Sequence, residues 1–191
     1  MDQYYKKINC IVNNKEILKN LLLSNEIINS KVTNSNNYIK VIKDINLEKK
    51  ILKLLRFEDL PIREIVLVSI PKNSSSLIHT DGTLRKLSLL IPITNCKKIL
   101  FNWWKPIDNE KIKIVNFPCK HNQIEPISIV DKKSSHLLDY TYIDQPTIIN
   151  IKNFHNIENT SADDSLEILL SIRIINEDES FENIINSVKE R

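Results

Sequence analysis

The chain has 191 residues, 41% of them hydrophobic and 27% charged, a size and balance that fit one soluble globular domain. The 27 basic and 24 acidic residues give a net charge of +3, which is too small to indicate nucleic-acid binding through a concentrated basic face. A single glycine excludes the glycine-rich phosphate loops of the common nucleotide-binding folds.

The first third of the chain carries helical patterns. Apolar residues recur at helical spacing over residues 15–28 and again over 47–55, where the pattern ends before Pro61. The polar segment 30–37 between them is predicted to be a loop. We therefore expect residues 1–60 to form a helical part that packs on the remainder of one domain, residues 1–191.

Short runs rich in β-branched residues replace the helical patterns after Pro61. Seven runs bounded by polar or turn residues indicate strands over residues 64–70, 84–94, 98–104, 112–117, 127–130, 147–154 and 166–175. Their number and spacing predict a β-sandwich or barrel. Apolar residues at helical spacing over 181–188 then predict a short C-terminal helix, with Ser180 as its N-cap.

Cysteine usage and hydropathy indicate the compartment. Cys10, Cys96 and Cys119 form an odd set without the CxxC spacing of metal sites, so we expect no disulfide framework and a reducing environment. No apolar run approaches the roughly 20 residues of a membrane span, and residues 1–7 lack a signal-peptide core. We expect a cytoplasmic protein, in the host cytoplasm if the source is viral, without a membrane partner.

Segment 77–82 carries the most informative pattern. In an extended segment His79 and Asp81 point the same way, so both can bind one metal ion. Gly82, the only glycine, follows directly and allows a tight turn or a close approach of a ligand. His-x-Asp alone is a weak signal, but His155, at the end of a strand-like run, supplies a third ligand. Two histidines and one carboxylate match the facial triad of non-haem Fe(II) oxygenases.

The last predicted strand, residues 166–175, has two distinct faces. Alternation separates an aliphatic face from one that carries Glu167, Leu169, Ser171 and Arg173. If the second face lines a barrel, the Arg173 guanidinium and the Ser171 hydroxyl could hold a carboxylate of a dicarboxylate cosubstrate. The alternative for Arg173 is a structural salt bridge, for instance with Glu167 on the same face.

The remaining histidines and the tryptophan pair have simpler interpretations. His121 and His136 lie in polar stretches and are expected to be solvated. Trp103 and Trp104 are adjacent in a predicted strand and so face opposite ways. One of them is expected to pack in the core, and the other is a candidate to line a pocket.

With these residues identified, the chain resembles the Fe(II)/2-oxoglutarate-dependent dioxygenases, in particular their prolyl-hydroxylase-like and phytanoyl-type members. The matching pieces are His79-Thr80-Asp81-Gly82 leading into 87–95, the Trp103-Trp104 pair, 146–150 before His155, and 170–173. The resemblance implies a mainly β fold, with a double-stranded β-helix core over 62–175, N-terminal helices and a C-terminal helix within 176–191. It further implies Fe(II) bound by His79, Asp81 and His155, and 2-oxoglutarate as cosubstrate, decarboxylated to succinate while a substrate is oxidised.

One departure from the family concerns the cosubstrate anchor. In these enzymes the arginine that binds the far carboxylate of 2-oxoglutarate usually lies closer after the distal histidine, near the position of Glu167. Residues 156–165 have the pattern of an extended polar loop, which leaves three possibilities open. Arg173 serves after a longer loop, which we favour, or another cation such as Arg85 serves, or cosubstrate binding is impaired.

The leading hypothesis is therefore a 2-oxoglutarate-dependent hydroxylase that acts on a small-molecule or peptide substrate, with no strong nucleic-acid signal. One alternative is a non-catalytic double-stranded β-helix protein that serves as a binding or scaffold module and has a degenerate cosubstrate site. Another is a cupin-like isomerase or hydrolase that uses a different metal.

Overall fold

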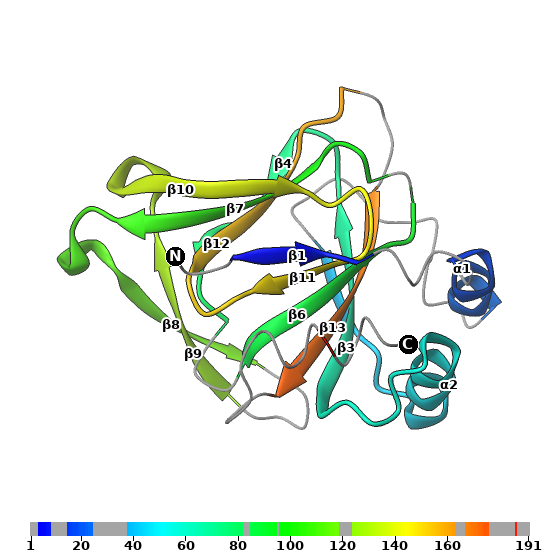
Figure 1. The fold of residues 1–191 in the computed structure, drawn as a ribbon. Coiled ribbons are helices and arrows are strands. Elements are labelled where there is room, and N and C mark those ends of the chain that lie inside the picture. The colour runs from blue at the N-terminus through cyan, green and yellow to red at the C-terminus, as the bar shows by residue number, and fades with distance from the viewer. Residues whose placement is uncertain are drawn as a thin grey trace.

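The computed structural model describes residues 4–8, 15–24, 38–81, 85–94, 96–118, 124–162, 167–175 and 186. These residues form two antiparallel β-sheets that face each other, and two α-helices (Figure 1). No described helix is long and apolar enough to cross a membrane.

The first sheet has six strands. In spatial order they are β1 (Tyr5–Lys7), β11 (Thr147–Asn150), β6 (Arg85–Pro92), β13 (Glu167–Ile175), β3 (Ile62–Ile70) and β2 (Tyr38–Val41). Strand β13 is central, and its register sets Arg173 opposite Ser88 of β6 on one side and opposite Glu64 of β3 on the other. Three polar residues that are far apart in the sequence therefore lie in one row across the sheet.

The second sheet has seven strands. In spatial order they are β10 (Ser135–Tyr142), β7 (Ile99–Pro106), β12 (Phe154–Asn159), β5 (Ile78–His79), β9 (Ile124–Val130) and β8 (Lys113–Pro118), and the short β4 (Ser74–Ser75) also pairs with β12. His155 of β12 is opposite His79 of β5 on one side and opposite Trp103 of β7 on the other.

The chain crosses between the two sheets from β5 to β6 to β7, and again from β10 through β11 and β12 to β13. Strands β5, β7, β10 and β12 belong to the seven-stranded sheet, whereas β6, β11 and β13 belong to the six-stranded sheet. This winding is the double-stranded β-helix, so the predicted fold class is confirmed. It brings β5 and β12, which are more than seventy residues apart in the sequence, into direct contact.

The helices α1 (Lys15–Ser24) and α2 (Ile45–Leu55) lie on the outer side of the six-stranded sheet (Figure 1). Their apolar stripes form one buried cluster with the outward-facing residues of the sheet. The helices contribute Leu18, Leu22, Ile51 and Leu55 to this cluster, and the sheet contributes residues that include Ile65, Leu89 and Ile172. Helix α2 begins after Asp44, whose side chain accepts hydrogen bonds from the backbone N–H groups of Asn46 and Leu47. It ends at Arg56, which has a left-handed backbone with φ of 60°.

The space between the sheets is the second core. Leu90, Phe101, Trp103, Ile149 and Leu169 are among its buried residues. The alternation predicted for β13 is confirmed, because Ile168, Leu170, Ile172 and Ile174 face the helices. Leu169 belongs to the core between the sheets, and Ser171 and Arg173 line a pocket there. The polar face of β13 therefore points into the barrel.

Two predictions about the polar parts of the chain were wrong. The run 147–154 is two strands, β11 and β12, and residues 156–159 of the predicted loop belong to β12 in the middle of a sheet. This stretch looked like a loop because Asn156 and Glu158 supply polar contacts, including a hydrogen bond from Asn156 Nδ2 to Ser75 Oγ at 2.7 Å. Strand β10 was missed because most of its residues are exposed, which removes the alternation signal.

Several predictions concern residues outside the described ranges. They include the end of the first helix and the loop at 30–37, Gly82, His121, Cys10, Cys119 and nearly all of the C-terminal helix, of which only the helical Asn186 is described. The remaining cysteine, Cys96, is a buried thiol whose Sγ donates to the carbonyl oxygen of Ile168 at 3.4 Å.

Candidate metal centre

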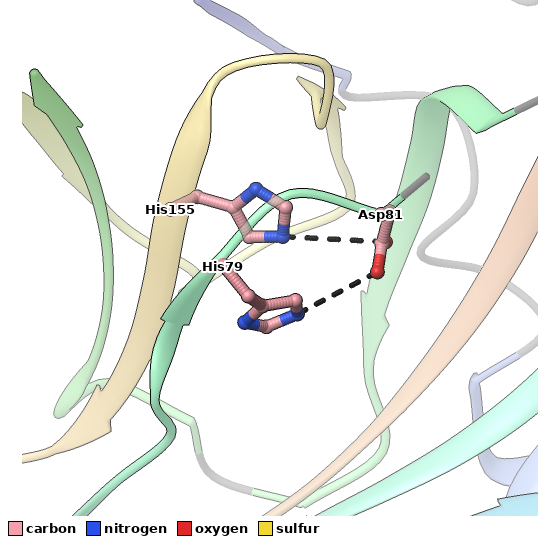
Figure 2. Close-up of side chains that lie close together, drawn as sticks. All are labelled: His79, Asp81 and His155. Carbon is pink, nitrogen blue, oxygen red and sulfur yellow. Dashed lines mark ion pairs between the residues drawn. The ribbon is translucent and has the colours of Figure 1, made fainter. Parts of the chain in front are cut away.

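Three side chains of ligand type meet between the two sheets. His79 ends β5, Asp81 follows two residues later, and His155 is the second residue of β12. Figure 2 shows both imidazole rings with one nitrogen turned toward the Asp81 carboxylate. The structure thus brings together the three residues that the sequence pattern singled out.

The distances within this group suit a single metal ion. The Nε2 atom of His79 is 3.5 Å from Oδ1 of Asp81, and the Nε2 atom of His155 is 4.0 Å from Oδ2 of Asp81. The three potential ligand atoms all lie within 4.8 Å of one another. Two ligand atoms that bind one ion in neighbouring positions, each at about 2.1 Å, are about 3 Å apart. A small inward movement of the three side chains would therefore allow all of them to bind one ion.

Backbone carbonyls fix the tautomer of both histidines. Nδ1 of His79 is 2.8 Å from the carbonyl oxygen of Leu77, and Nδ1 of His155 is 2.8 Å from the carbonyl oxygen of Asn153. Because a carbonyl oxygen only accepts hydrogen bonds, each Nδ1 carries a hydrogen and donates it. In the neutral rings the Nε2 lone pairs are then directed at the centre of the group, which is the arrangement of metal-binding histidines.

The protonation states also favour a ligand group. Burial would raise the pKa of Asp81, but Arg173 and the two imidazoles outweigh burial and hold this pKa well below its usual range. Burial, together with the neighbouring His79, lowers the pKa of His155 to about 4. Burial would also lower the pKa of His79, but its interactions with the nearby Asp81 raise this pKa above its usual value. At neutral pH the group therefore contains one carboxylate and a neutral His155.

Aromatic side chains hold the His155 ring in place. Phe101 stacks on this ring, with 5.0 Å between centroids and an interplanar angle of 18°. Trp103 packs against Phe101 in turn, and its Nε1–H donates to the carbonyl oxygen of Asn150 at 2.8 Å. Trp104 points to the opposite face, where its Nε1–H donates to Asn156 at 2.7 Å. Both tryptophans are buried, and neither is among the lining residues of the pocket beside the triad.

A pocket adjoins the three potential ligands. Its polar lining consists of Ser76, His79, Asp81, Ser88, His155, Ser171 and Arg173, and its apolar lining consists of Ile39, Val68, Leu90, Phe101, Ile149, Ile151 and Ile157. The predicted binding residues Ser171 and Arg173 therefore share a pocket with the triad. Ser88 was not predicted as a pocket residue. The available signal was its position two residues before Leu90, which puts both residues on the same face of β6.

Arg173 forms a buried salt bridge. Its Nη1 donates to Oε1 of Glu64 at 2.6 Å, and the two residues are 8% and 1% exposed. Arg173 therefore has the structural salt bridge that the sequence left as an alternative, and the described partner is Glu64. The carboxylate of Glu167, the suggested partner, accepts a hydrogen bond from Thr94 Oγ1 at 2.7 Å. Beside Arg173, the hydroxyl oxygens of Ser171 and Ser88 are 2.7 Å apart.

Two other candidate residues remain, Arg85 and His136. The side chain of Arg85, the alternative anchor, lies outside the described residues. His136 is exposed on β10, as expected for a solvated histidine.

Comparison with known proteins supports the fold. No protein-family model matches the sequence, and a search of curated proteins finds no match. SnoK, a non-haem α-ketoglutarate-dependent carbocyclase from nogalamycin biosynthesis, is 13% identical, with a TM-score of 0.50 over 92% of this chain and 81% of SnoK. A prolyl-4-hydroxylase from Pseudomonas putida is 9% identical, with a TM-score of 0.44 over 91% of this chain and 93% of its own.

A third solved structure, EvdO2 from Micromonospora carbonacea complexed with 2-oxoglutarate, is 11% identical, with a TM-score of 0.46 over 95% of this chain and 91% of its own. At these identities the likeness to SnoK shows a shared fold alone. Fold and site together define this protein as a double-stranded β-helix protein with a His-Asp-His group that could hold a metal ion.

Proposed function

We propose that the protein is an Fe(II)-dependent oxygenase that couples the oxidative decarboxylation of a 2-oxoacid to the hydroxylation of a substrate. The observation that carries this proposal is the group of His79, Asp81 and His155, with two directed Nε2 atoms and an ionised carboxylate beside a pocket. Two histidines and one carboxylate are the ligand set of non-haem Fe(II) oxygenases.

The donor set also leaves room for reactants. Three protein ligands on one side of an ion leave further coordination positions open. Two neutral imidazoles and one carboxylate leave a divalent ion with a net positive charge, which favours an anionic chelating ligand. Bound Fe(II) would supply the redox chemistry with dioxygen.

The side chains of the pocket would bind and orient the reactants. Arg173 and Ser171 present hydrogen-bond donors to the pocket and so could hold a carboxylate group. The aliphatic lining, which includes Leu90 and Ile149, would exclude water from the site. We propose that the substrate is a small molecule or a peptide. We also propose that the oxoacid is 2-oxoglutarate, which is the cosubstrate that the sequence resemblance implies.

The overall reaction balances with dioxygen as the oxidant. The 2-oxoacid loses CO₂ and becomes the carboxylic acid that is one carbon shorter, and a C–H bond of the substrate becomes C–OH. One oxygen atom of O₂ enters the new carboxylate, and the other enters the hydroxyl group. The oxoacid and the substrate each give two electrons, which together reduce one O₂.

The test is CO₂ release from a 2-oxoacid by the Fe(II)-loaded protein in air. We expect release by the wild type, and its loss in Asp81→Ala and His155→Ala. The matched control is His136→Ala, which removes an exposed histidine and should leave the rate unchanged. Equal release by the wild type and both triad variants would contradict the proposal.

One observation favours a second candidate, a non-catalytic binding module of the same fold. The salt bridge from Glu64 already engages the Arg173 guanidinium that an oxoacid would use. A protein that binds a metal ion but neither binds nor consumes any 2-oxoacid would fit this second candidate.

A further inference from the structure

The strand that carries His155 pairs irregularly with the segment that carries His79. These two histidines are opposite each other, and so are Glu158 of β12 and Ser75 of β4. Between the two pairs β12 has two residues, whereas the facing segment has three, residues 76–78. One extra residue is the mark of a β-bulge, an irregularity that changes the direction of nearby side chains. This bulge comes directly before a potential metal ligand.

The side chain of Ser76 takes the place of a backbone group at this bulge. In a regular antiparallel pair, two opposite residues exchange two backbone N–H···O bonds. Here the backbone N–H of Ser76 donates to the carbonyl oxygen of Ile157 at 2.9 Å. The returning bond, from the backbone N–H of Ile157, goes to Oγ of Ser76 at 3.0 Å. The hydroxyl group of Ser76 is therefore fixed to the backbone of β12.

The same hydroxyl group links β12 to the imidazole ring of His79. Because a backbone N–H can only donate, Oγ of Ser76 accepts the bond from Ile157 and keeps its own hydrogen for another acceptor. That acceptor is the carbonyl oxygen of Leu77, at 3.2 Å, and the same oxygen accepts from Nδ1 of His79 at 2.8 Å. A continuous chain of hydrogen bonds therefore runs from the backbone of β12 through Ser76 and Leu77 to His79.

The two histidines of the triad are held in different ways. The side chain of His155 is 5% exposed, and its ring stacks on Phe101 in the interior of a sheet. The side chain of His79 is 24% exposed, and the ring contact described for it is with His155 itself, at 4.7 Å between centroids. The orientation of the His79 ring therefore depends more on its hydrogen bond to Leu77 than on packing.

We propose that Ser76 is a positioning residue of the metal centre, which holds the Leu77 carbonyl group against Nδ1 of His79 and so keeps Nε2 of His79 directed at the metal ion. The inference rests on the proposed function only in that the triad binds a metal ion. A ring that is free to turn must be ordered when the ion binds, and this ordering lowers the affinity. Loss of a group that orients a metal ligand typically lowers metal affinity by about 10–100-fold.

The test is the Mn(II) affinity of serine variants, measured by electron paramagnetic resonance in the absence of any oxoacid. Ser76→Ala should bind Mn(II) about tenfold more weakly than the wild type, whereas Ser76→Thr keeps a hydroxyl group and should retain the wild-type affinity. The matched control is Ser75→Ala, which should also retain it. The hydroxyl group of Ser75 likewise bonds to β12, since its Oγ accepts from Nδ2 of Asn156 at 2.7 Å, but no described bond joins it to Leu77.

The outcomes separate this inference from the proposed function. Equal affinity of the wild type and Ser76→Ala, or an equal loss in Ser75→Ala and Ser76→Ala, would overturn the inference and leave the proposed function standing. A wild-type protein that binds no Mn(II) would overturn both.

A second measurement separates positioning of His79 from a general loosening of the sheet. In protein loaded with Zn(II), which has no unpaired electrons, proton NMR reports how fast each histidine Nδ1–H exchanges with water. We expect faster exchange at His79 in Ser76→Ala than in the wild type. Exchange at His155 should not change, because its Nδ1–H donates to the carbonyl oxygen of Asn153. Unchanged exchange at His79, or faster exchange at both histidines, would contradict the proposed role of Ser76.

Discussion

The salt bridge between Glu64 and Arg173 leads to the sharpest prediction about stability. Its side chains are 1% and 10% exposed, so a substitution of either partner leaves the other charge buried. Loss of one member of such a pair destabilises a protein by about 3–5 kcal/mol. At about 2–4 °C per kcal/mol for a chain of this length, Tm should fall by roughly 6–20 °C in Glu64→Leu or in Arg173→Met.

The double variant should recover most of this loss, because it buries neither charge. Urea unfolding of the wild type, both single variants and the double variant, followed by circular dichroism at pH 7, gives the coupling energy. The control is Lys7→Ala, because Lys7 and Asp144 form an ion pair at the same 2.6 Å distance but are 35% and 44% exposed. This variant should lose at most about 1 kcal/mol. Comparable losses in Lys7→Ala and Glu64→Leu would refute the reasoning.

Three further predictions concern the metal centre and the helical layer. His155→Ala should lose Mn(II) binding, measured by electron paramagnetic resonance, while His136→Ala keeps it. Lower pH should weaken Mn(II) binding about tenfold per pH unit below the raised pKa of His79, because one proton competes with the metal there. His155 has a pKa of about 4, so at pH 5–6 it carries no second proton that competes with the metal. A twofold steeper slope of log affinity against pH in that range would contradict these protonation states. Asp44→Ala should lower stability by about 1 kcal/mol without changing Mn(II) affinity, because it removes only the N-cap of α2; a change in affinity would disprove this separation.

The metal centre could be predicted from the sequence because its key signals are local. His79 and Asp81 are two residues apart in an extended segment, so they share a direction without any knowledge of the fold. The faces of β13 were predictable for the same reason, since alternation alone separates Ser171 and Arg173 from the aliphatic residues. His155 could be added because it ends a run with strong strand character.

The pairing across strands could not be predicted from local pattern. Glu64 and Arg173 are 109 residues apart, and only the register of β3 with β13 makes them partners. An acidic residue at the start of an apolar strand was a signal that Glu64 needs a buried partner, but not which one. Strand β12 was missed because its polar residues bond to neighbouring strands, so a central strand had the composition of a loop.

The oxygenase proposal is tested most directly by the fate of dioxygen. The Fe(II)-loaded protein is incubated with a 2-oxoacid under ¹⁸O₂, and the product acid is analysed by mass spectrometry. We expect one ¹⁸O atom in the new carboxylate, and no product acid from the Asp81→Ala protein. Product acid without ¹⁸O, or formed equally in the absence of dioxygen, would contradict the assignment of this site as an oxygenase centre.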